Sequence, residues 1–208
     1  MSQNETSQNT MRWTAANVVT MIRVIAIPFW LLFAMNSVTG IDMDTMVNSG
    51  TISQSALIVA IFYIALALTD KLDGYLARSR NEVTDFGKFL DPIADKLIVL
   101  VALMYLLVVN QISIWIPTII VAREFLVSGL RMVVASSGKV VAASGLGKAK
   151  TATTLVAICG YLIQLSLVPG DVSTALYLFS EIVMLVAVVL TIISGIDYFI
   201  KAQDIVKG

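Results

Sequence analysis

The sequence predicts an all-α integral membrane protein with six transmembrane helices, and three features of the chain support this fold class. Hydrophobic residues make up 58% of the 208 residues, whereas charged residues make up only 13%. The mean hydropathy is +0.87, a value that a soluble domain of this length rarely reaches. Apolar stretches alternate along the chain with short polar segments that hold much of the charge.

The N-terminal segment, residues 1–12, is predicted to be disordered or to lie at the membrane interface. Residues 1–10 are polar and lack the basic start and apolar core of a cleaved signal peptide. Arg12 and the adjacent Trp13 form a typical interfacial anchor. The first span is predicted over residues 17–35, where Pro28 is expected to bend the helix.

Five further spans follow, and each is delimited by polar or turn-forming residues. Their apolar bodies are predicted at about 55–69, 85–109, 114–136, 151–168 and 173–199. The connecting segments are a polar loop (36–52), a charged link (79–84), a tight turn (110–113), a glycine- and lysine-rich loop (137–150) and a turn around Pro169. Residues 13–201 are therefore expected to form a single six-helix catalytic domain, followed by a cytoplasmic tail at 202–208.

The basic residues predict the orientation of the bundle. We define side A as the N-terminus, the 79–84 link, the 137–150 loop and the C-terminus. The basic residues assigned to side A are Arg12, Arg78, Arg80, Lys139, Lys148, Lys150, Lys201 and Lys207. The three opposite loops contain no lysine or arginine. By the positive-inside rule, side A is cytoplasmic and both termini lie inside.

Two absences narrow the chemistry. Cys159 is the only cysteine, so no disulfide can form within the chain. The chain has no histidine, which excludes a histidine base and a histidine-ligated zinc. Acid–base catalysis would therefore fall to a carboxylate, a lysine or a tyrosine.

Four aspartates stand where the second span ends and the third begins. Asp70 and Asp73 are three residues apart, and Asp91 and Asp95 are four apart, so each pair lies on one face of a helix. Either pair alone could belong to a turn or a helix cap. Together, four carboxylates near a membrane surface require a positive partner, and their hard oxygens suit Mg²⁺, Mn²⁺ or Ca²⁺.

The residues around the aspartates favour a functional site. Gly74, Ala77 and Gly87 allow close approach of a helix or ligand, and Arg78 offers a bidentate phosphate donor. The pattern Asp-x-x-Asp-Gly-x-x-Ala-Arg, followed by Gly-x-x-x-Asp-x-x-x-Asp, resembles the signature of the CDP-alcohol phosphotransferase family at every fixed position. This resemblance implies a membrane transferase that displaces CMP from a CDP-alcohol. It also implies two divalent ions, Mg²⁺ or Mn²⁺, held by the four aspartates.

The resemblance further implies roles for individual residues. Asp95 would also act as the general base that deprotonates the acceptor hydroxyl. The CDP-alcohol would be bound by Gly74, Ala77, Arg78 and Gly87, together with Asn17, Thr20 and Arg23 of the first span. Asn17 could instead cap its helix, and Thr20 could bond to its own backbone. Arg23 lies so deep in an apolar helix that it should face a partner or a cavity.

Basic residues in the second half of the chain are candidates for binding a phosphorylated acceptor. Arg123 either pairs structurally with Glu124 or faces the carboxylate cavity and binds the acceptor phosphate. The other candidates are Arg131, Lys139 and Lys148. The stretch from Gly145 to Thr151 lacks the Ser or Thr that a P-loop needs directly after its lysine. It is predicted instead to be a mobile cationic loop, or simply positive-inside charge.

Flanking residues resemble the bacterial branch of the family that uses CDP-diacylglycerol and glycerol 3-phosphate. This resemblance implies a multi-pass enzyme of the bacterial cytoplasmic (inner) membrane with its active site facing the cytoplasm. It also implies a homodimer surrounded by membrane lipids, with no nucleic-acid partner. Phosphatidylglycerol, as in cardiolipin synthesis, or another alcohol remains an alternative acceptor. An ion transporter lined by carboxylates is a remote alternative, because the acidic residues gather at one face.

Overall fold

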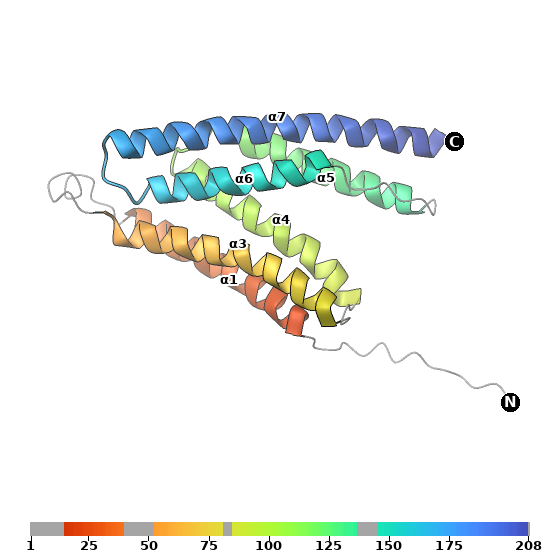
Figure 1. The fold of residues 1–208 in the computed structure, drawn as a ribbon, viewed down its shortest axis with the longest axis horizontal. Helices are drawn as coiled ribbons and strands as arrows, with labels where there is room; N and C mark the ends of the chain where they lie inside the picture. Colours follow the sequence, from red (N-terminus) through yellow and green to blue (C-terminus); the bar gives the residue numbers. More distant parts are fainter. Residues whose placement is uncertain (1–14, 40–51, 81–84, 137–144, 208) are drawn as a thin grey trace.

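The computed structural model describes residues 15–39, 52–80, 85–136 and 145–207, and this part of the chain folds into six helices without a strand (Figure 1). The helices are α1 (Ala15–Thr39), α3 (Gln54–Arg80), α4 (Asp85–Val108), α5 (Trp115–Ser136), α6 (Gly145–Gln164) and α7 (Asp171–Lys207). Side chains at 15–17, 38–39, 70–80, 85–92, 136 and 204–207 lie outside the description. The prediction of an all-α protein is confirmed.

Each predicted span lies largely within one helix. Among the described residues, two helical segments are long and apolar enough to cross a membrane: Val18–Ser37, with mean hydropathy 2.2, and Asp171–Gln203, with mean hydropathy 2.5. A shorter apolar segment covers Gln54–Thr69. These segments support a membrane protein, whereas six spans and the orientation of the termini stay predictions.

The helices alternate in direction, so their ends gather at two poles (Figure 1). The first residues of α1, α4 and α6 and the last residues of α3, α5 and α7 lie at the same pole, on the right of the view. This pole corresponds to side A. Helices α1 and α3 run diagonally below α6 and α7, and the two pairs diverge towards side A (Figure 1).

An aromatic cluster joins the first three helices near the centre of the bundle. The indole ring of Trp30 lies 5.4 Å from the ring of Tyr63 and 5.6 Å from that of Tyr105, measured between centroids. All three side chains are almost completely buried. The indole Nε1 of Trp30 also donates a 3.0 Å hydrogen bond to the backbone carbonyl of Val59. This bond satisfies a polar atom that would be costly to bury alone, and it fixes α1 against α3.

Helices α6 and α7 form an antiparallel pair with close contact. A Cβ atom built on Gly160 would lie 2.2 Å from the Oγ atom of Ser180, so only glycine fits there. The hydroxyl of Tyr161 donates a 2.7 Å hydrogen bond to Glu181. Small residues that admit a neighbouring helix, combined with polar side chains bonded across the interface, are typical of helix packing in membranes.

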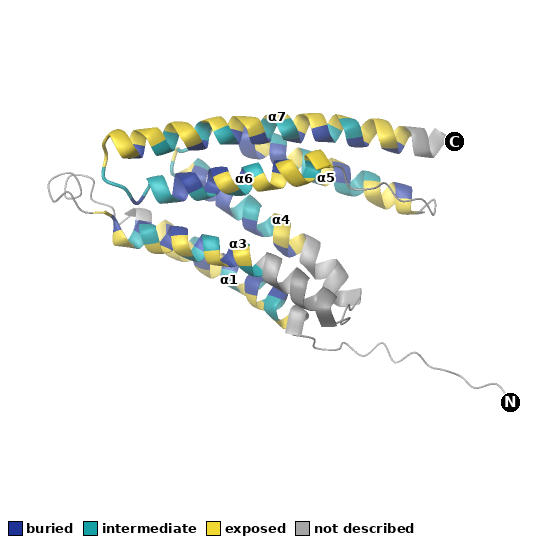
Figure 2. Ribbon diagram, viewed as in Figure 1, coloured by how far each residue is buried: buried dark blue, intermediate teal, exposed yellow. Residues whose placement is uncertain are grey.

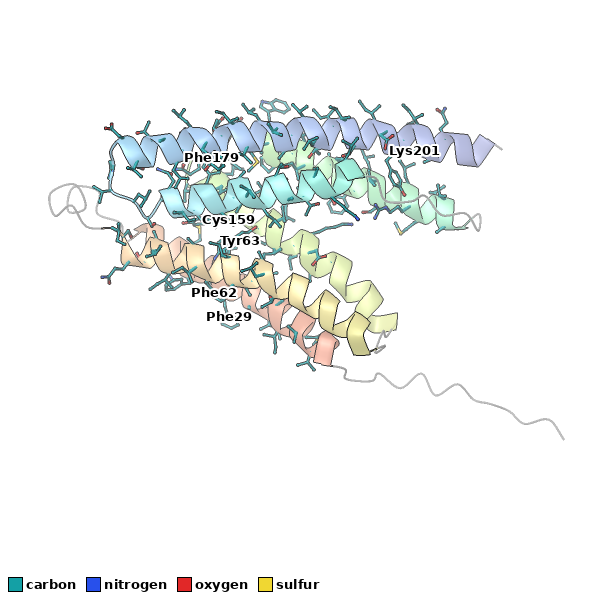
Figure 3. All side chains as sticks on the ribbon, viewed as in Figure 1. Phe29, Phe62, Tyr63, Cys159, Phe179 and Lys201 are labelled. Carbon is teal, nitrogen blue, oxygen red and sulfur yellow. The ribbon has the colours of Figure 1, made fainter. Side chains whose placement is uncertain are left out.

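The outer faces of the helices are apolar. Figure 2 shows exposed residues along the outward side of α7 and α1, with buried residues on the inner sides. In Figure 3, Tyr63 and Cys159 lie on the facing sides of α3 and α6, whereas Phe29 points away from the bundle and is 63% exposed. A surface of this kind suits contact with lipid chains.

One predicted loop is partly wrong. Residues 145–150 were expected to continue the loop, but α6 begins at Gly145. The side chain of Lys150 is buried and paired with Glu124 of α5, so this turn packs against a neighbour rather than extending into solvent. Tertiary contact therefore overrides the loop tendency of the glycines at 145 and 147.

Candidate active site

The four predicted metal ligands lie on two helices that meet side A. Asp70 and Asp73 belong to the last three turns of α3, and Asp91 and Asp95 belong to the first three turns of α4. The predicted helical spacing of each pair is present in the backbone. The side chains of Asp70, Asp73 and Asp91 lie outside the described residues.

The side chains of several other predicted site residues also lie outside the described part of the structure. Gly74, Ala77 and Arg78 lie in α3, Gly87 in α4 and Asn17 in α1, but only their backbone is described. Lys139 falls outside the described residues altogether. Their assignments stay predictions. Thr20 is described, and it is buried in α1.

Arg23 and Asp95 are brought together across the interface of α1 and α4. The Nη1 atom of Arg23 lies 3.6 Å from Oδ1 of Asp95, and Nε donates to the hydroxyl of Thr69 at 3.5 Å. Arg23 is 2% exposed, whereas the Asp95 side chain is 47% exposed. The expectation that Arg23 faces a partner is confirmed, and its partner is the aspartate predicted to be the base. The carboxylate of Asp95 thus contacts a buried cation while about half of its side chain is exposed.

The donor chemistry fits a divalent cation. Among the described side chains, no group of three or more histidines, cysteines or carboxylates could hold a metal ion. The side chains of three of the four predicted ligands lie outside that set, whereas the half-exposed carboxylate of Asp95 belongs to it. Carboxylate oxygens at helical spacing on α3 and α4 are the hard ligands that Mg²⁺ and Mn²⁺ prefer.

A cavity of about 530 Å³ lies among α4, α5, α6 and α7. We call it the cationic pocket, because five basic side chains line it and the one acidic residue of its lining is Glu124. The basic residues are Lys96, Arg123, Arg131, Lys148 and Lys150. Three of the four residues predicted to bind the acceptor phosphate, Arg123, Arg131 and Lys148, thus line one cavity.

Glu124 joins two of these cations. Its Oε1 atom accepts a 2.9 Å hydrogen bond from Nη1 of Arg123 and also contacts Nζ of Lys150 on α6. The Nη2 atom of Arg123 donates to the Oγ atom of Ser194 on α7 at 3.0 Å. Arg123 therefore does both things that the sequence left open: it pairs with Glu124 and it lines the cavity. Both amino groups of its guanidinium are already bonded to protein.

The other cations of the cationic pocket are less enclosed. The guanidinium of Arg131 lies over the ring of Tyr198, 5.2 Å from its centroid, and the ring fixes one face of this exposed side chain. Lys96 donates a 2.5 Å hydrogen bond to Ser128 of α5. Lys148 is exposed at the start of α6. These three cations are placed to meet an anion that enters the cavity.

The cationic pocket and the predicted base share one turn of α4. Lys96, which lines the cavity, directly follows Asp95 on α4. Consecutive residues of a helix are separated by a rise of only about 1.5 Å. Consecutive side chains point about 100° apart around the helix axis, and here they contact different helices: Asp95 contacts Arg23 of α1, and Lys96 contacts Ser128 of α5. The cationic pocket and Asp95 are therefore neighbours along α4, and Asp95 is not one of the residues that line the cavity.

Sequence reasoning missed some of the lining. Lys96 was not singled out, although its position after Asp95 was a usable signal. Lys150 was expected to attract anions from a loop, whereas it is buried at the base of the cavity. Tyr198, which lines the cavity, and Ser194, which binds Arg123, look like ordinary residues of an apolar span, and nothing in their spacing indicates these roles.

Comparison with known proteins identifies the family. The sequence profile described as CDP-alcohol phosphatidyltransferase matches residues 13–193 of the chain. The chain belongs to this family. It is 38% identical to CDP-diacylglycerol–glycerol-3-phosphate 3-phosphatidyltransferase of Bacillus subtilis (strain 168), over 92% of this chain and 96% of that protein. The protein of the same name in Escherichia coli (strain K12) is 35% identical, over 93% and 97% of the two chains. A probable phosphatidylglycerophosphate synthase of Mycobacterium tuberculosis (strain H37Rv) is also 35% identical, over 93% and 83%.

Membership of the CDP-alcohol phosphatidyltransferase family confirms the prediction of an enzyme that transfers a phosphatidyl group. The family match covers α1 to α6 and more than half of α7, so it includes the four aspartates and every lining residue of the cationic pocket except Tyr198. Enzymes of this family generally use a divalent metal ion.

Proposed function

We propose that this enzyme transfers the phosphatidyl group of CDP-diacylglycerol to a hydroxyl of glycerol 3-phosphate, giving phosphatidylglycerophosphate and CMP. The observation that carries the proposal is the cationic pocket, because it suits an acceptor that brings its own phosphate. The names of the relatives in Bacillus subtilis and Escherichia coli specify the same pair of substrates.

The charge of the cationic pocket favours a phosphate monoester. Five cations and one carboxylate leave the lining with a net of four positive charges. A phosphate monoester carries a charge of about −1.5 to −2 at neutral pH. The phosphate diester of phosphatidylglycerol carries a single negative charge and brings two acyl chains. A small dianion therefore matches the cationic pocket better than a second lipid does.

The donor is assigned to the aspartates. Asp70, Asp73, Asp91 and Asp95 would hold two divalent ions, Mg²⁺ or Mn²⁺. When bound, such ions polarise the phosphoryl oxygens and neutralise charge on the departing CMP. Asn17, Thr20, Gly74, Ala77, Arg78 and Gly87 are assigned to the CDP-alcohol.

Asp95 accepts the proton of the acceptor hydroxyl. The hydroxyl oxygen then forms a bond to the phosphorus that carries diacylglycerol, while the bond from that phosphorus to the CMP oxygen breaks. Arg23, assigned to the CDP-alcohol side, also contacts the Asp95 carboxylate and orients it for this role. Side A faces the cytoplasm in this proposal, with six helices in the bilayer, because cytosolic glycerol 3-phosphate must reach the cationic pocket.

An acceptor panel tests the proposal. The purified enzyme in detergent receives CDP-diacylglycerol and Mg²⁺ with glycerol 3-phosphate, phosphatidylglycerol, inositol 1-phosphate or serine, and CMP release is measured. We expect turnover with glycerol 3-phosphate and its loss when EDTA removes the metal. Turnover with phosphatidylglycerol alone would instead identify a cardiolipin synthase. CMP release without any membrane to cross would also eliminate a transporter.

A pair of variants tests the cationic pocket itself. Arg131→Ala removes an exposed cation of the pocket, whereas Lys201→Ala removes a cation of α7 that pairs with Asp197 and does not line it (Figure 3). The first variant should raise the KM for glycerol 3-phosphate by about tenfold, the usual scale for one charge-assisted contact. The second should leave it unchanged. An equal effect of both variants would mean that only the overall charge of side A matters.

A further inference from the structure

Glu124 is the acidic residue in the lining of the cationic pocket, and an anion is an unexpected neighbour for a bound phosphate. We infer that Glu124 is a positioning residue of the acceptor site: its carboxylate holds Arg123 and Lys150 together as a fixed base beneath the phosphate. This inference rests on the proposed function. It assigns to Glu124 a role in binding geometry, without contact with the reacting atoms.

The contacts of Glu124 explain why it is needed. Arg123 and Lys150 approach the same carboxylate atom, Oε1, from α5 and α6. Their side chains are only 14% and 8% exposed, so solvent does little to screen their mutual repulsion. An anion between them is therefore required to keep both cations charged and close together.

The same contacts tie three helices together. Glu124 and Arg123 lie on α5, Lys150 on α6 and Ser194, the second partner of Arg123, on α7. The guanidinium is therefore bonded at both of its amino groups before any acceptor arrives. An arginine fixed in this way loses little conformational freedom when it meets a phosphate, which strengthens binding.

Two explanations of Glu124 predict opposite effects when its charge is removed. If the carboxylate acted only through its charge, Glu124→Gln would make the cationic pocket more positive, and phosphate would bind more tightly. If the carboxylate positions the cations, the same change would release Lys150 and Arg123 from their shared anchor, and phosphate would bind more weakly. The direction of the change therefore distinguishes the explanations.

The experiment measures the full-length enzyme in detergent. Glu124→Gln is compared with Glu181→Gln, a control that removes another partly buried carboxylate, bonded to Tyr161 and absent from the lining of the cationic pocket. The readouts are the KM for each substrate, kcat, the inhibition constant of inorganic phosphate against glycerol 3-phosphate, and the melting temperature. We expect Glu124→Gln to raise the KM for glycerol 3-phosphate and the phosphate inhibition constant by about tenfold. Its KM for CDP-diacylglycerol should stay unchanged, and the control should change neither KM.

Two further measurements complete the test. Glu124→Asp keeps the negative charge but moves it back by one methylene. The KM of this variant for glycerol 3-phosphate should therefore lie between those of the wild type and Glu124→Gln. Glu124→Asp also serves as the test variant if Glu124→Gln does not fold. In the presence of Lys150→Met, Glu124→Gln should have less effect than alone, because the pair acts as a unit.

Specific outcomes would overturn the inference. A lower KM for glycerol 3-phosphate in Glu124→Gln would favour the charge explanation. A lower melting temperature with both KM values unchanged would mean that the residue serves only the fold. If the unmodified enzyme did not use glycerol 3-phosphate, the proposed function itself would be wrong. The acceptor panel detects that failure before any Glu124 variant is made.

Discussion

Replacing Arg23 by methionine is expected to impair the chemical step by acting on Asp95. Methionine keeps much of the length and apolar packing of the arginine stem but removes the charge 3.6 Å from the Asp95 carboxylate. Breaking a fully buried ion pair costs about 3–5 kcal/mol. The Asp95 side chain is 47% exposed, so water compensates for part of that loss. We therefore expect a loss of roughly 1.5–3 kcal/mol, the range for a contact to a charged group.

This loss corresponds to a reduction in kcat of roughly ten- to a hundredfold, since about 1.36 kcal/mol changes a rate tenfold. The assay is CMP release per mole of folded enzyme, with KM measured for both substrates. Two further variants separate the contributions of Arg23. Arg23→Lys keeps the positive charge and should therefore recover part of the activity. Recovery should be incomplete, because lysine lacks the planar guanidinium group. Thr69→Val removes the weak 3.5 Å contact with Nε, together with a local 2.7 Å hydrogen bond to the carbonyl of Leu66, and should change kcat by less than about threefold.

Two results would refute this reasoning. If Arg23→Met lowered the melting temperature but left kcat intact, the ion pair would serve folding alone. If the variant raised only the KM for CDP-diacylglycerol, Arg23 would bind the nucleotide without acting on Asp95.

Three other substitutions give separate expectations. Asp95→Asn should abolish turnover and leave CDP-diacylglycerol binding largely intact, as measured by CMP release and equilibrium binding of the donor; full activity would eliminate the base assignment. Arg123→Ala should raise the KM for glycerol 3-phosphate roughly ten- to a hundredfold and far more than that for CDP-diacylglycerol, with only partial rescue by lysine; an equal rise for both substrates would point to a role in the fold. Gly160→Ala should destabilise the protein by about 1–3 kcal/mol, because the new Cβ atom would lie 2.2 Å from the Ser180 hydroxyl. Adding Ser180→Gly should restore part of the melting temperature, and no restoration would mean that the strain lies elsewhere.

The sequence was sufficient for the number, order and approximate limits of the helices within residues 15–39, 52–80, 85–136 and 145–207. Apolar stretches broken by charged or turn residues are a strong signal in a membrane protein, because polar groups within the bilayer are expensive. The turn predicted at 110–113 illustrates this. Asn110 adopts a positive φ of 56°, and the backbone N–H of Gln111 bonds to the carbonyl of Leu106, which is how such helices end.

The partners of the charged residues could not be predicted in the same way. The position of Arg23 deep within an apolar helix predicted that this residue needs a partner. Only the packing of α1 against α4 identifies Asp95 as that partner. The glycines before Lys150 suggested a loop, and the compensating contact with Glu124 comes from a different helix. Periodicity determines which face of a helix is buried, whereas the neighbour of that face depends on how distant segments pack.

The aromatic cluster around Trp30 gives this enzyme an optical reporter of its own. The indole is 1% exposed and bonded to Val59, whereas Trp115 is 69% exposed on the outer surface. Buried and exposed indoles emit at different wavelengths, and the chain has three tryptophans, so replacing both Trp13 and Trp115 by phenylalanine would leave Trp30 as the single indole. Trp30 stands two turns along α1 from Arg23, and Val59 lies on the helix that carries Asp70. A change in emission on adding CDP-diacylglycerol would therefore report movement of α1 against α3 without any attached dye.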